Sequence, residues 1–153
     1  MSSTFTPSRR TVLSAGAIAA LAATLAPRMA LADEKMVADE IKKLYGDKKM
    51  DAGKIKLDVP QIAENGLVVP ITVDIESPMT DADFVKAVHV FADGNPQPGV
   101  VSYVFTPDCG KASASTRMRL AQTQNVVCIA EMSNGALFTA KAEVKVTIGG
   151  CGG

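Results

Sequence analysis

The spacing of apolar residues changes once along the chain, and each spacing predicts a different kind of element. Residues 33–46, DEKMVADEIKKLYG, carry apolar side chains at close to helical spacing, with acidic residues early and lysines late. These apolar residues are Met36, Val37, Ile41, Leu44 and Tyr45. A glycine is typical of a helix end, so we predict one helix that stops at Gly46.

From Lys54 onward, short runs of β-branched residues alternate with turn residues. The first run, KIKLDVP, places Ile55, Leu57 and Val59 on one face. The later runs are GLVVPITVDI, FVKAVHVFAD, VVSYVF, ASASTRMRLA, NVVCIAEM and ALFTAKAEVKVTI. Pro70, in the second run, indicates a sheet edge or a bulge. About seven strands, with turns such as GNPQPG and SNG between them, predict an all-β fold, an immunoglobulin-like β-sandwich.

The first 32 residues have the order of an export signal, and we exclude them from the fold. Arg9 and Arg10 in SRRTVLS are close to the twin-arginine pattern. The apolar stretch at 15–26 is too short and too rich in alanine for a membrane span, which needs about 20 strongly apolar residues. The sequence ALA at 30–32 has the form of a cleavage site. We therefore expect a periplasmic protein without a membrane anchor that starts near Asp33; the alternative is an amphipathic helix with a chance arginine pair.

Composition limits the possible partners of the mature chain. The whole sequence has 16 basic and 16 acidic residues, and three arginines leave with the signal, so 13 basic residues remain against 16 acidic ones. No basic patch interleaves with aromatic residues, which makes nucleic acid an unsuitable partner. The remaining 121 residues are enough for one domain, which we place at 33–148.

Several polar residues are weak candidates for chemistry. His89 is the only histidine, with no second ligand or nucleophile in a suitable pattern, so we expect a structural role for it. Asp81 and Asp83 lack the spacing of a calcium loop and are predicted to be solvated. Arg117 and Arg119 alternate along one strand and either pair with acids across the sheet or form a weak anion site.

Two of the three cysteines lie inside the predicted domain. In an oxidising compartment, two cysteines of one small domain usually pair, and a bridge from Cys109 to Cys128 would add roughly 3 kcal/mol of stability. Cys109 lies in the turn-like PDCG and Cys128 within the strand VVCIA, so this pairing needs the turn to fold over the strand. The alternative is a buried free thiol at Cys128 and a partly exposed thiol at Cys109.

The third cysteine, Cys151, stands between glycine pairs in the terminal sequence VTIGGCGG. Glycine adds no side chain, so the tail 149–153 is thin and flexible, and three extended residues past Ile148 would project the sulfur roughly 10 Å from the domain. An ordinary cysteine with a pKa of about 8.5 is only a few per cent thiolate near pH 7. Such a thiol suits activation inside another protein's active site, which is the chemistry of a carrier. No Cys-x-x-Cys accompanies it, which argues against a thiol oxidoreductase.

The sequence resembles the SoxY family, the sulfur carriers of the bacterial Sox thiosulfate-oxidising system. The resemblance rests on VTIGGCGG, VHVFADGNPQP and STRMRLAQTQNVVCIAEMSNGALF, together with the twin-arginine signal, and it covers most of the chain. It implies an immunoglobulin-like sandwich that forms a heterodimer with SoxZ and is a carrier without a cofactor of its own. Cys151 would be the covalent attachment point for sulfur, with Gly149, Gly150, Gly152 and Gly153 as its flexible flanks.

The resemblance also implies the proteins that act on the carrier. The c-type cytochrome SoxAX would join thiosulfate oxidatively to Cys151, and the hydrolase SoxB would release sulfate and leave a persulfide. In some organisms the sulfane dehydrogenase SoxCD would oxidise the remaining sulfur. Cys109 and Cys128 are additional to the family pattern, and their pairing or burial would leave Cys151 as the single accessible thiol. The rival hypothesis is an exported β-sandwich binding or adhesion module that dimerises through Cys151.

Overall fold

The computed structural model describes residues 32–150, and the predicted signal up to residue 31 lies outside it. This part of the chain contains one α-helix, nine strands and a 3-10 turn, η1 (Pro107–Cys109). The helix is α2 (Glu34–Tyr45), and the strands are β1 (Met50–Ala52), β2 (Ile55–Asp58), β3 (Ile62–Asn65), β4 (Val69–Ile75), β5 (Val85–Ala92), β6 (Gly99–Val104), β7 (Ala112–Met118), β8 (Gln124–Met132) and β9 (Leu137–Ile148). Within residues 32–150, no helix is long and apolar enough to cross a membrane.

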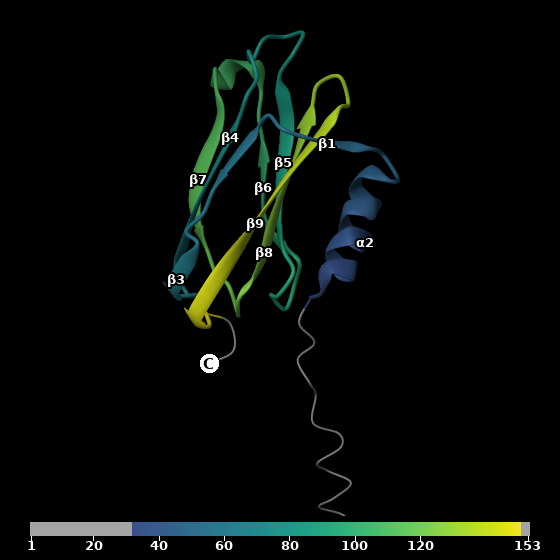
Figure 1. Cartoon of the computed structure of the whole chain (residues 1–153). Helices are drawn as coiled ribbons and strands as arrows, with labels where there is room; N and C mark the ends of the chain where they lie inside the picture. The colour runs from purple at the N-terminus through teal and green to yellow at the C-terminus, as the bar shows by residue number, and fades with distance from the viewer. Residues whose placement is uncertain (1–31, 151–153) are drawn as a thin grey trace, which may run out of the picture.

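Two sheets form a sandwich, which confirms the predicted all-β, immunoglobulin-like fold (Figure 1). The larger sheet has the order β1-β9-β8-β5-β6, with β3 also paired to β9, and the smaller sheet has the order β2-β4-β7. β9 is long enough for two short strands to pair with it in parallel: β1 near its start and β3 near its end. These two strands raise the number in the described residues above the seven expected. Each has only three or four residues, too few for a readable apolar alternation.

The core follows the alternation of apolar residues. β4 buries every second residue from Val69 to Ile75, and β8 buries Val126, Cys128 and Ala130 on the same inner face. At Pro70, β4 has only β7 beside it, because β2 pairs no further than Thr72. Pro70 has no amide hydrogen to donate, and β2 has no residue opposite it that would need one. This agrees with the predicted edge position.

Helix α2 covers the outer face of the larger sheet (Figure 1). The carboxylate of Asp33 accepts a 2.8 Å hydrogen bond from the Met36 amide, and Gly46 caps the other end with a φ of 67°. The predicted helix and its end at Gly46 are thus confirmed. Its apolar side packs through Val37 and Tyr45 onto a second cluster of buried residues, Phe91, Ile129 and Leu137.

Candidate functional site

Three backbone segments meet where β9 ends. The amide of Gly66, in the turn after β3, donates a 2.7 Å hydrogen bond to the Ile148 carbonyl. The Leu120 amide, after β7, donates to the Gly66 carbonyl over 2.8 Å, and the Gly150 amide donates to the Leu120 carbonyl over 2.8 Å. We call Gly66, Leu120, Ala121, Gly149 and Gly150 the glycine junction. It fixes the last described residue of the chain to two loops that are distant in sequence.

The junction needs glycine because the backbones touch. A Cβ on Gly150 would overlap the carbonyl group of Gly66, and one on Gly149 would overlap the Ala121 carbonyl oxygen. A Cβ on Gly66 would overlap the Leu120 carbonyl oxygen in the same way. All three overlaps lie well inside 3.0 Å, a distance that real Cβ contacts do not reach. None of these glycines has a positive φ, so the requirement is for space and not for an unusual conformation.

The structure adds contacts that were not expected at Gly149 and Gly150, whereas the flexibility of these two flanks stays a prediction. Gly150 is buried and hydrogen-bonded, and Gly149 lies against Ala121. The chain therefore follows the domain two residues further than expected, and its reach is counted from Gly150 and not from Ile148. Cys151, Gly152 and Gly153 lie outside the described residues, so their predicted roles stay predictions.

The predicted disulfide between Cys109 and Cys128 is wrong, and within residues 32–150 both thiols are free. Cys128 lies in the middle of β8 with its side chain in the core, where burial raises the pKa of its thiol to about 12. Cys109 lies on η1 and is exposed, 3.8 Å from the hydroxyl of Thr106. The turn that carries Cys109 does not fold over the strand, so the alternative of a buried and an exposed thiol is correct.

Burial thus prevents Cys128 from competing with Cys151 for sulfur, but Cys109 stays exposed. Figure 1 shows η1, the short green helix, at the end of the sandwich opposite to the end of β9. Cys109 is exposed, but η1 places it at the far end of the sandwich from the glycine junction (Figure 1).

The other sequence candidates form no shared site. His89 is half-buried and hydrogen-bonded to Ser102 over 2.8 Å, and burial lowers its pKa, which agrees with a structural role. Asp83 closes a local turn with Thr80. Among residues 32–150, no group of acidic, histidine or cysteine side chains could hold a metal ion.

Arg117, on β7, and Arg119, just after this strand, are exposed, and neither forms an ion pair within the described part of the chain. Both line a shallow hollow between the edges of β6 and β7. The predicted pairing with acids is therefore absent here, and the weak anion site stays a prediction.

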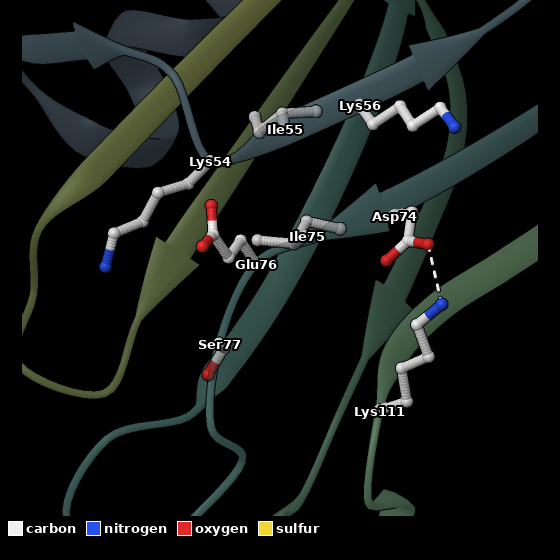
Figure 2. Close-up of a pocket in the computed structure, with 8 residues that line it drawn as sticks. All are labelled: Lys54, Ile55, Lys56, Asp74, Ile75, Glu76, Ser77 and Lys111. Carbon is white, nitrogen blue, oxygen red and sulfur yellow. Dashed lines mark hydrogen bonds and ion pairs between the residues drawn. The ribbon is translucent and has the colours of Figure 1, made fainter.

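A larger hollow, of about 490 Å³, lies at the edge of the smaller sheet. Lys54, Lys56 and Lys111 line it together with Asp74 and Glu76. Figure 2 shows that the three ammonium groups point in different directions, and that of Lys111 is paired with Asp74 over 2.7 Å. The charges do not converge, so this hollow has no feature of a specific anion site.

Sequence reasoning missed Gly66, Leu120 and Ala121 as members of the site at the end of β9. The pair Asn65-Gly66 is a turn signal, and nothing near it indicates contact with a segment more than 80 residues later. Only the mutual position of the two loops brings these residues to the end of β9.

Comparison with known proteins places these features in a family context. The family model described as sulfur oxidation protein SoxY matches residues 41–151. Among solved structures, the sulfur carrier protein SoxY from Chlorobium limicola f thiosulfatophilum is 34% identical, with a TM-score of 0.63. The match covers 74% of this chain and 98% of that one. No curated protein gives a significant match.

Superoxide reductases share the fold at low identity. The neelaredoxin from Ignicoccus hospitalis is 16% identical with a TM-score of 0.56, over 61% of this chain and 80% of that one. The putative superoxide reductase from Thermotoga maritima is 17% identical with a TM-score of 0.53, over 64% and 87%. At this level of identity the likeness concerns the arrangement of strands alone.

Proposed function

The chain belongs to the SoxY family of sulfur oxidation proteins, and on that basis we propose that it is a periplasmic carrier that holds thiosulfate-derived sulfur covalently on Cys151. The observation that carries the proposal is the extent of the family match, which runs from residue 41 to the terminal cysteine itself. The twin-arginine pattern at Arg9 and Arg10 supports the periplasmic location.

The proposed loading step is an oxidation. The Cys151 thiol loses its proton and forms a sulfur–sulfur bond to the outer sulfur of thiosulfate, which gives a Cys-S-S-sulfonate and releases two electrons. A c-type cytochrome of the SoxAX kind would accept the electrons. The chain has no cofactor in this scheme and acts as the substrate-bearing subunit.

The proposed unloading step is a hydrolysis. Water attacks the terminal sulfonate group, sulfate and a proton leave, and a persulfide remains on Cys151. A hydrolase of the SoxB kind would perform this step. Where SoxCD is present, it would oxidise the outer persulfide sulfur to a sulfonate with three waters, which releases seven protons and passes six electrons to a c-type cytochrome acceptor. We also propose a SoxZ-type subunit as the stable partner, as in the family.

The described residues support a single loading site. Cys128 stays protonated because burial raises the pKa of its thiol, and the core side chains around it exclude a partner enzyme. Cys109 is exposed on η1, but the turn is held at both ends by β6 and β7, so no glycine-rich extension can carry this thiol into an active site. Cys151, between two glycine pairs, meets that steric requirement.

The test is the intact mass of the mature protein from cells grown with and without thiosulfate, before and after a reductant. Peptide mapping assigns any added mass to a cysteine. We expect reductant-labile sulfur or thiosulfonate on Cys151 with thiosulfate, no such mass in Cys151→Ser, and unchanged loading in the control Cys109→Ser. A bare thiol or only a disulfide-linked dimer under every condition would instead support the binding-module hypothesis.

A further inference from the structure

Three exposed apolar side chains surround the glycine junction. Leu67 is 48% exposed, Val68 56% and Ile148 67%. The Leu67 amide nitrogen touches the position that a Cβ of Gly150 would take, and Val68 is its chain neighbour. Ile148 bonds through its carbonyl to Gly66. We call Leu67, Val68 and Ile148 the arm-root patch.

The position of the patch is more informative than its apolar character. Single exposed apolar residues are ordinary on protein surfaces, but a cluster of them often marks an interaction site. In residues 32–150, the other exposed large apolar side chains are dispersed: two lie on α2 (Met36 and Leu44), one on β3 (Ile62) and one on β6 (Val104). The three of the patch lie within two residues of Gly66 or Gly150 along the chain.

Covalent geometry limits how far a reactive sulfur can be from this patch. Three residues follow Gly150 in the sequence. The next Cα is 3.8 Å from that of Gly150, so the sulfur of Cys151 lies within about 7 Å of the Gly150 Cα. While the junction is closed, a catalytic group that reaches this sulfur must belong to a surface in contact with the surroundings of Gly150.

We propose that the arm-root patch is the docking surface for the enzymes that act on Cys151. Each enzyme would bind the patch through the apolar rim of a narrow active-site entrance. This rim would pack on Leu67, Val68 and Ile148 while Cys151 enters the active site. Apolar contacts are not directional, so several unrelated enzymes can use the same small surface in turn. This inference rests on the proposed carrier function and names the surface through which that function is exercised.

The test uses the full mature chain with its natural partner subunit and a periplasmic extract from cells grown on thiosulfate. The patch variants are Leu67→Ser with Val68→Ser, and Ile148→Thr. The control is Val104→Ser, which changes the most exposed of the large apolar residues, 80% exposed on β6. Thiosulfate loading on Cys151 is followed by intact mass, and its alkylation by iodoacetamide without extract is followed separately.

We expect the patch variants to load about tenfold more slowly at low carrier concentration, because each lost apolar contact at an interface weakens binding. Loading should recover at high carrier concentration, since docking and not chemistry is impaired. Alkylation, the unfolding midpoint and co-purification of the partner subunit should not change, and Val104→Ser should load like the wild type.

Different failures have different meanings. Patch variants that load at the wild-type rate would overturn the docking surface and leave the carrier function intact. Loss of the partner subunit would show that the patch binds that subunit, and slower alkylation would show that the patch affects the exposure of Cys151 itself. Either result overturns the inference. If the wild type does not load, the carrier function and the docking surface both fall.

Discussion

The amide of Gly150 donates a 2.8 Å hydrogen bond to the carbonyl of Leu120. The two residues are 30 positions apart in the sequence, and their contact fixes the last described residue to the loop after β7. The contact turns a terminal glycine pair into part of the domain. Under the proposed carrier function, Cys151 would follow directly after this anchored residue.

The first prediction concerns the space at the junction. In Gly150→Ala the new methyl group would overlap the Gly66 carbonyl, so we expect the junction to open or the domain to lose about 1–3 kcal/mol. Opening would expose the Gly66 amide, whose acceptor is the Ile148 carbonyl, and raise its hydrogen-exchange rate. Urea unfolding and hydrogen exchange measure the two effects.

The matched control is Gly99→Ala, because a Cβ at that position meets no atom within 4 Å and the φ is not positive. Both variants restrict the unfolded chain equally, which by itself favours alanine by about 0.4–1 kcal/mol. Equal behaviour of the two variants would show that Gly150 is not tightly packed.

The second prediction concerns the exposed thiol. Because Cys109 is exposed and free, Cys109→Ser should change the free energy of unfolding by less than about 0.5 kcal/mol. The variant should lose one rapidly reacting thiol in a titration of the native protein and keep its sulfur loading. A loading defect would mean that Cys109 takes part in sulfur transfer.

The third prediction concerns the buried thiol. Burial raises the pKa of Cys128 from 9.0 to about 12, so below pH 9 the folded and unfolded chains both keep the thiol proton. As the pH rises from about 9 to about 12, the unfolded chain loses this proton first, and the folded state loses stability. Urea unfolding at several pH values should therefore show a steeper alkaline decline for the wild type than for Cys128→Ala. If wild type and Cys128→Ala lost stability in parallel as the pH rises, the buried position of the Cys128 thiol would be contradicted.

The fourth prediction concerns Tyr45, whose hydroxyl is buried without a hydrogen-bond partner in the part of the chain that the structure describes. Tyr45→Phe removes this unpaired group and keeps the ring against His89, 5.8 Å away between centroids. We expect the free energy of unfolding to rise by about 1 kcal/mol in urea unfolding. Tyr103→Phe, at a half-buried tyrosine on β6, is the control. A loss of stability confined to Tyr45→Phe would show that its hydroxyl is satisfied.

Local patterns in the sequence were sufficient for the elements themselves. The helix from Glu34 to its end before Gly46 and the main strands follow from apolar spacing, because periodicity decides which face of an element can be buried. The terminal motif around Cys151 was sufficient to indicate the family, which the match to residues 41–151 supports.

Contacts between distant segments were decided only by the tertiary structure. Cys109 and Cys128 are close in sequence, but the sandwich buries one and exposes the other, so spacing could not tell whether they pair. Gly149 and Gly150 look flexible in a sequence, because glycine permits both free rotation and close approach of backbones. Which of the two applies depends on whether another backbone is present, and here Gly66 and Leu120 arrive from loops that only the paired sheets bring to the end of β9.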